Sequence, residues 1–147
     1  ETLPDESAFR PMRIKFFTEA LQDQENVANS DRIKFIIKEI LPRTGEFWTK
    51  TLGVVPVDGK LRVNTAFLSN GMYCGDSEFT RVPNEHISQG VSDVDLILYV
   101  SATPSTRFCG PSTLAVAVAC NFDMFDRPTV GAINVCLEQV EIDETTG

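Results

Sequence analysis

The sequence predicts an α/β (α+β) fold, in which a long helix packs on a twisted, mixed and mostly parallel sheet of about five strands. Three observations predict it: an apolar–charged alternation at Met12–Phe16, apolar residues at helical spacing after Asp31, and a nearly continuous apolar run at Val94–Val100. The expected order is strand, helix, strand, long loop and three further strands. A helix covering a largely parallel sheet is the most economical arrangement for that order. The 147 residues show no internal repeat, so we expect residues 1–147 to form one domain.

The first half of the chain is expected to supply the first strand and the long helix. The alternation at Met12–Phe16 is typical of a strand with one buried face. Ser30 and Asp31 are good N-cap residues, so the helix should begin at about Asp31. Pro42 has no N–H and its ring clashes with the preceding turn, so it should kink or end this helix. The residues at helical spacing are Ile33, Ile36, Ile37, Ile40 and Leu41.

The later segments are shorter. A second helical stretch through Phe47, Trp48 and Leu52 is expected to continue the same axis, with the aromatic pair in the core rather than at a ligand site. The apolar run at Val94–Val100 suits a central strand covered on both faces. Leu114–Ala119 alternates bulky residues with small alanines, as a strand can. The remaining expectations are a short strand at Leu61–Val63, a loop over residues 68–93 and a last strand at Thr129–Val135.

The composition limits the classes of partner. Thirteen Lys and Arg against twenty-one Asp and Glu give a net charge of −8, which argues against nucleic acid and against an anionic membrane surface. The longest apolar run is far too short to span a bilayer, so no transmembrane segment is expected. The chain has no initiator methionine and no signal-peptide pattern, and we interpret it as a processed chain or an excerpt.

Four cysteines are present, at positions 74, 109, 120 and 136. An even number in a domain of this size favours two disulfides and an oxidising compartment, and therefore the secretory pathway. The alternative is four buried free thiols in a cytosolic protein. The sequence contains no C-x-x-C pair and one histidine, so a structural zinc site is poorly supported. Four cysteines allow three pairings, and the residues alone do not choose among them.

No catalytic motif is visible in the sequence. The nucleophile elbow, the phosphate-binding loops and the H-E-x-x-H zinc motif are all missing. His86 lies in a predicted loop, where we expect it to bond the backbone or face solvent rather than act in catalysis. Asp93 and Asp95 flank Val94 and could form an acid–base pair or bind a cation. The alternative, which we favour, is a turn at Asp93 and a solvated Asp95. The residues describe a scaffold without catalytic residues.

Several separated motifs nevertheless resemble the leishmanolysin family of zinc metallopeptidases. The resemblance covers about residues 10–137 and implies the N-terminal subdomain of a metzincin-like fold, a twisted sheet with a backing helix. The matching motifs are Pro11–Ile14, Cys74-Gly75-Asp76, Val82-Pro83, His86-Ile87, Gly90, Asp93 and Asp95 before LILYV, TLAVAVAC at residues 113–120, Asp126–Pro128, Val130-Gly131 and Ile133–Cys136.

The resemblance also implies particular roles. It implies that Cys74 pairs with Cys120 and that Cys109 pairs with Cys136, which leaves no free thiol. It implies that the strand at Leu114–Ala119 is the edge to which a peptide or protein substrate adds by main-chain hydrogen bonds. The substrate-binding residues would be Leu114, Ala115, Val116 and Ala117, although ordinary sheet packing explains the same alanines equally well.

The sequence departs from the family at its catalytic centre. The family's H-E-x-x-H-x-x-G-x-x-H motif does not occur in it, so we expect no catalytic residue and no metal ligand in this chain. Zinc would belong to the parent protein, an extracellular or cell-surface endopeptidase whose active-site half lies downstream. We expect the chain to need a partner, either that half or another subunit, because an excised half-domain exposes apolar surface. The alternative is a non-catalytic peptidase-like module in adhesion or in an extracellular assembly.

Overall fold

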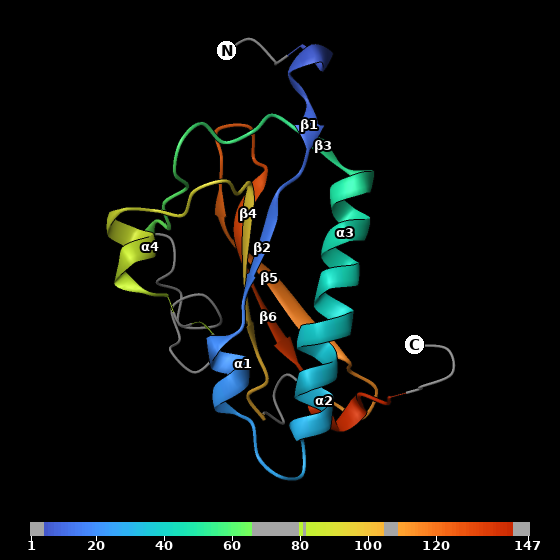
Figure 1. The fold of residues 1–147 in the computed structure, drawn as a ribbon. Coiled ribbons are helices and arrows are strands. Elements are labelled where there is room, and N and C mark those ends of the chain that lie inside the picture. Colours follow the sequence, from blue (N-terminus) through green and yellow to red (C-terminus); the bar gives the residue numbers. More distant parts are fainter. Residues whose placement is uncertain (1–4, 66–79, 81, 105–108, 143–147) are drawn as a thin grey trace.

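The computed structural model describes residues 5–65, 80, 82–104 and 109–142. Its main body is a sheet between two layers of helix, with α3 on one side and α4 on the other (Figure 1). In chain order the elements are a 3-10 turn at Glu6–Ala8, β1 Arg10–Pro11, β2 Ile14–Phe17, α1 Glu19–Asp23, α2 Ser30–Phe35, a π-helical turn at Ile36–Ile40, α3 Leu41–Thr51, β3 Gly53–Val54, α4 Asn84–Ser88, β4 Leu96–Ser101, β5 Ala115–Phe122, β6 Pro128–Val135 and a 3-10 turn at Leu137–Gln139.

The predicted fold class is confirmed. The main sheet has the strand order β2-β4-β6-β5, in which β2, β4 and β6 are parallel and β5 is antiparallel to β6. A separate two-stranded ribbon pairs β1 with β3. The described part of the main sheet therefore has four strands, where the sequence suggested about five.

The short strand predicted at Leu61–Val63 is wrong. Leu61 makes only an isolated bridge to Val91, with hydrogen bonds of 2.9 and 2.8 Å in the two directions. Two residues later the N–H of Val63 donates to the carbonyl of His86 at 3.0 Å, within the short helix α4. The strand-like pairing does not extend beyond Leu61, because Val63 bonds to helix α4 rather than to a second strand. The same helix corrects the expectation that residues 68–93 are loop throughout; residues 66–79 and 81 lie outside the described residues.

The long helix passes the proline without ending. The N–H of Leu41 donates to the carbonyl of Ile36, five residues back, which is the bond of a π-helical turn. This wide turn stands immediately before Pro42 and takes up the disturbance that proline causes. The helix then continues to Thr51, so the expected second helical stretch on the same axis is confirmed.

The aromatic pair of α3 does not lie in the core, contrary to the prediction. Phe47 is 59 % and Trp48 43 % exposed, and their rings meet edge to face at 5.2 Å. The inward-facing residues of α3 step by four, from Leu41 to Gly45, where a Cβ atom would lie 3.0 Å from the Phe16 ring. Beyond the wide turn, the apolar spacing of α2 no longer indicates which side of the helix faces the sheet.

Two apolar clusters lie on opposite faces of β4, which confirms that this strand is covered on both sides. Ile97 and Tyr99 belong to the cluster that α4 closes through Ile87. Val100 belongs to the cluster that Ile33 and Ile36 of the long helix close. The alternation of side chains along β4 divides the core into these two halves.

Candidate functional site

β5 forms one edge of the main sheet. Among the described strands it pairs with β6 alone, in the register Ala115 to Val135 and Ala117 to Ile133. An edge strand leaves every second N–H and C=O without a partner in the sheet, which is the chemistry that an added peptide strand uses. The position of β5 therefore allows a peptide to extend the sheet on this side.

The register shows which residues of β5 turn their main chain outward. The N–H of Cys136 donates to the carbonyl of Leu114 at 2.9 Å, so this opposed pair is a hydrogen-bonded pair of the antiparallel ladder. Such pairs alternate with pairs whose main-chain groups point away from each other. Val116 and Val118 therefore face β6 through their main chain. The outward N–H and C=O groups belong to Ala115, Ala117 and Ala119.

The outward-turned residues are also the small and exposed ones. Ala115, Ala117 and Ala119 are exposed, whereas Val116 and Val118 are half-buried and Val118 packs against the cluster around Ile97. Within the described ranges, a second backbone can approach β5 closely because the outward-turned residues carry only methyl side chains. Of the four residues predicted to bind substrate, the alternation of hydrogen-bonded pairs favours Ala115 and Ala117. It adds Ala119, which the sequence analysis missed because the sequence alone does not reveal which residues of β5 form hydrogen bonds with β6.

The far end of the edge is fixed by a hydrogen-bonded turn. One carboxylate oxygen of Asp123 accepts from the N–H groups of Phe125 and Arg127, at 2.8 and 2.9 Å, and the other accepts from Nε of Arg127 at 3.1 Å. Burial tends to raise the pKa of Asp123, but these hydrogen bonds and the guanidinium outweigh it and the net pKa is lowered. The turn thus holds the β5–β6 hairpin in one shape while Asp123 is ionised.

Asp95 is not solvated, contrary to the prediction. Its side chain is fully buried, and it accepts from the N–H and Nε of Arg13 at 2.9 and 3.0 Å, from Nη2 of Arg13 at 3.0 Å and from the N–H of Val57 at 2.7 Å. Asp93 forms a turn with φ 56° and remains exposed, as expected. Asp95 is therefore a structural carboxylate that joins β2 to β4, with both oxygens occupied, and not an acid–base group.

His86 also departs from the prediction, because it is buried in α4. Nδ1 lies 2.7 Å from the Tyr99 hydroxyl, and the Phe17 ring stands edge-on at 4.5 Å. Desolvation lowers the pKa of His86, against the opposing charges of Glu19 and Glu85, and burial raises the pKa of Tyr99. The imidazole is thus a neutral part of the core and not a catalytic group.

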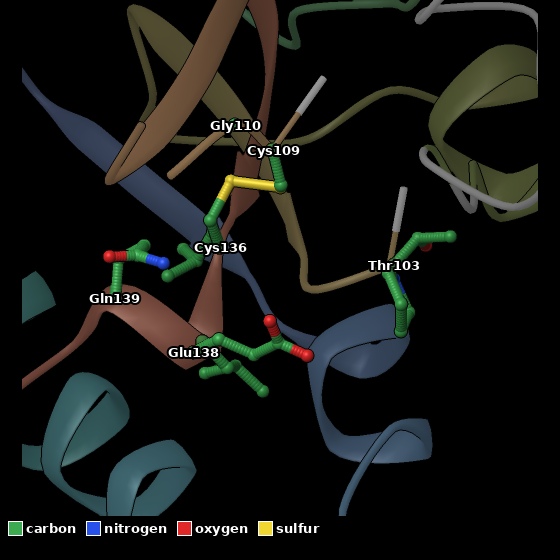
Figure 2. Close-up of a pocket in the computed structure, with 9 residues that line it drawn as sticks. Thr103, Cys109, Gly110, Cys136, Glu138 and Gln139 are labelled. Carbon is green, nitrogen blue, oxygen red and sulfur yellow. A yellow bond between two sulfur atoms is a disulfide. The ribbon is translucent and has the colours of Figure 1, made fainter. Parts of the chain in front are cut away.

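The structure contains the Cys109–Cys136 disulfide that the resemblance implies, with the two Cα atoms 5.6 Å apart. Cys120 is also disulfide-bonded, and none of the three described cysteines is a free thiol. Cys74, its implied partner, lies outside the described residues. The Cys109–Cys136 bridge also lines a cavity of about 480 Å³ at the end of β6 (Figure 2).

The sequence of this chain is similar to that of known peptidases over most of its length. The Peptidase M8 family, described as leishmanolysin, matches residues 13–145. The chain belongs to the leishmanolysin family. Leishmanolysin of Leishmania major is 31% identical over 111 residues, which are 76% of this chain and 17% of that protein. The leishmanolysin-like peptidase of Caenorhabditis elegans is 35% identical over 79 residues, 53% of this chain and 12% of that protein.

A further member, the leishmanolysin homolog of Crithidia fasciculata, is 29% identical over 111 residues, 76% of this chain and 15% of that protein. The chain thus spans less than a fifth of the length of these leishmanolysin relatives. The chain is a fragment of a leishmanolysin-family peptidase domain.

The leishmanolysin family is one of zinc metallopeptidases, but the described residues do not fit a zinc centre. The chain has one histidine, and its ring contacts Tyr99 and Phe17 rather than other metal ligands. In the described ranges no three His, Cys, Asp or Glu side chains gather closely enough to hold a metal ion. In the same ranges no helix has the length and apolar character needed to cross a membrane.

Proposed function

We propose that this chain is the N-terminal part of an extracellular or cell-surface zinc metalloendopeptidase, and that it holds an extended segment of the substrate along β5. Membership of the leishmanolysin family supports the peptidase assignment. The observation that carries the substrate role is the side of β5 that no described strand pairs, where Ala115, Ala117 and Ala119 turn their N–H and C=O groups away from β6.

The substrate would bind by adding a strand to the sheet. Main-chain hydrogen bonds to alternate residues of β5 fix the peptide in an extended conformation and do not depend on its sequence. The methyl side chains of the alanines leave room for the side chains of the peptide. Hydrolysis itself requires the family's H-E-x-x-H motif, which is not in this chain, so residues 1–147 contribute positioning and not bond cleavage.

The proposed compartment follows from the disulfide chemistry. The Cys109–Cys136 bridge and the bonded state of Cys120 require an oxidising environment during folding. The secretory pathway provides one. We propose that residues 1–147 and the downstream peptidase segment form a single catalytic unit.

The experiment uses the full-length parent protein and compares Ala117→Pro with Ala117→Ser. Proline removes the outward N–H of residue 117 and leaves the ladder to β6 intact, whereas serine keeps that N–H. We expect Ala117→Pro to lower kcat/KM for peptide cleavage by about tenfold or more, the value of one lost main-chain hydrogen bond with some steric cost. Ala117→Ser should retain activity within about a factor of three.

Three results would contradict the proposal. Equal activity of the Ala117→Pro protein would exclude β5 as the substrate edge. Cleavage that persists after a chelator removes divalent metal would exclude the zinc mechanism. A parent protein that lacks H-E-x-x-H and cleaves nothing would instead support the non-catalytic module.

A further inference from the structure

A cavity of about 480 Å³ lies at one end of the molecule, where β4 and β6 finish. In parallel sheets the carboxyl ends of the strands are the usual place for ligands, and the volume falls in the range of small-molecule sites. Figure 2 shows the Cys109–Cys136 disulfide above the cavity and the Glu138 carboxylate extending toward the Thr103 side. The described lining residues are Thr103, Pro104, Cys109, Gly110, Val135, Cys136, Leu137, Glu138 and Gln139.

Two connections hold the walls of this cavity together. The Cys109–Cys136 disulfide ties one wall to the end of β6. The buried Asn134 ties the segment after β4 to the same strand: its Oδ1 accepts from the N–H of Thr103 at 2.8 Å, and its Nδ2 donates to the carbonyl of Thr103 at 3.1 Å. The described parts of the wall that these bonds hold lose little conformational freedom when a ligand enters.

The lining favours a ligand with an apolar stem and a positive end. Pro104, Val135 and Leu137 supply apolar surface, and the disulfide adds to it. Glu138 is the single charged residue among the described lining residues, and it stands exposed on the 3-10 turn Leu137–Gln139. The net charge of −8 for the whole chain adds a long-range attraction for cations and opposes anions.

We propose that this cavity binds an alkyl-ammonium or alkyl-guanidinium group, with the alkyl stem against the apolar wall and the cation beside Glu138. Lysine and arginine side chains of a peptide carry this group, and so do free amines such as agmatine. The inference does not depend on the docking of a peptide along β5, because the described lining contains no residue of β5, although Val135 is the ladder partner of Ala115.

The test titrates the full-length, disulfide-intact parent protein with agmatine and with the blocked dipeptide N-acetyl-arginyl-glycine amide, observed by ¹H–¹⁵N NMR. We expect saturable shifts at Gly110, Leu137 and Gln139 with both probes. Glu138→Gln should weaken the binding by about fivefold, the value of one partly solvated ion pair. Glu141→Gln removes a nearby exposed carboxylate outside the lining and should bind as the unaltered chain does.

Several results would overturn the proposal: no saturable shift with either probe, equal binding by pentylamine and by its uncharged analogue pentanol, or unchanged affinity in Glu138→Gln. The spectrum of Glu138→Gln reports its fold directly, so a loss of binding with a preserved spectrum supports the cation site. Tighter binding of the dipeptide than of agmatine identifies a peptide side chain as the source of the cation, and the reverse order identifies a free amine.

Discussion

Arg13 and Asp95 form a bidentate pair, with Nε to Oδ2 and Nη2 to Oδ1 both at 3.0 Å, at the point where β2 and β4 begin. The main chain repeats the connection, since the carbonyl of Arg13 accepts from the N–H of Asp95 at 2.7 Å. Both oxygens of a fully buried carboxylate are thus satisfied. The pair aligns the two strands.

Substitution of Asp95 by Asn should destabilise the fold strongly. The change leaves buried donors without a charged acceptor, which costs about 2–4 kcal/mol after allowance for the partial exposure of Arg13. Asp93→Asn is the matched control, because Asp93 is 85% exposed and 3.7 Å from the same guanidinium, and it should change the free energy of unfolding by less than about 0.5 kcal/mol. Urea unfolding measures both. Equal changes in the free energy of unfolding would show that the buried Arg13–Asp95 pair contributes no more to stability than the exposed Asp93.

The free energy of unfolding should fall in two stages as the pH is lowered from 7. The pKa of His86 is lowered by desolvation. Below about pH 6.5 the unfolded chain therefore binds a proton at this histidine more readily than the folded chain does. The pKa of Asp95 is lowered because its hydrogen bonds outweigh the effect of burial, so a second loss begins below about pH 4. In both stages the unfolded state binds more protons, and stability therefore rises with pH.

The first stage can be assigned to a single residue. His86→Gln should lower the overall stability but remove the pH dependence between pH 7 and pH 5, as measured by urea unfolding at several pH values. An NMR titration of His86 that gave a pKa at or above its ordinary value would contradict the assignment.

Proline substitutions along β5 should have opposite consequences at neighbouring positions. At residue 117 the N–H points away from β6, so Ala117→Pro should cost less than about 1 kcal/mol. At residue 118 the N–H belongs to the ladder, so Val118→Pro should cost about 3 kcal/mol or more. Thermal unfolding followed by circular dichroism distinguishes them. If the two variants were equally unstable, the phase of the ladder deduced from the Cys136–Leu114 hydrogen bond would be wrong.

Removal of the Cys109–Cys136 bridge should lower the free energy of unfolding, because the unfolded chain gains conformational entropy without the cross-link. The two cysteines are 27 residues apart, and closing a loop of that length is worth about 3.5 kcal/mol in the chain-entropy description. The double variant Cys109→Ala/Cys136→Ala should show this loss in urea, whereas the oxidised chain should bind no thiol-specific reagent at these two positions when denatured without reductant. Alkylation of either cysteine under those conditions would contradict the bridge.

Gly90 and Gly59 provide a test of close packing at two glycines that both have positive φ. Both have positive φ, 90° and 71°, but a Cβ atom at Gly90 would lie 2.9 Å from the carbonyl oxygen of Leu61, whereas at Gly59 nothing lies within 4 Å. Gly90→Ala should therefore destabilise by at least about 1 kcal/mol more than Gly59→Ala. The difference in urea midpoint measures the clash. No difference would mean that the Leu61 segment moves away freely.

Local patterns in the sequence were enough for the helix, the central strand and the strand at Leu114–Ala119, whereas the edge position of that strand came from the resemblance to the family. These elements were predictable because the apolar pattern of each one lies within a few neighbouring residues, and because both faces of β4 are apolar. The buried states of Asp95 and His86 could not be read in this way, because each depends on a partner on another element: Arg13, 82 residues from Asp95, and Tyr99, 13 residues from His86. The outward groups of β5 depend on the phase of a ladder, and a shift of one residue would reverse them.

The π-helical turn before Pro42 means that the long helix contains one residue more than a regular spiral would use over the same rise. One residue corresponds to about 100° of rotation. Deleting any one residue of the wide turn would swing every downstream side chain by that angle. Phe47 and Trp48 would then both point to a different part of the surface from the one at which they now lie. A single surplus residue, more than one turn away, thus decides which part of the molecule presents these two rings to water.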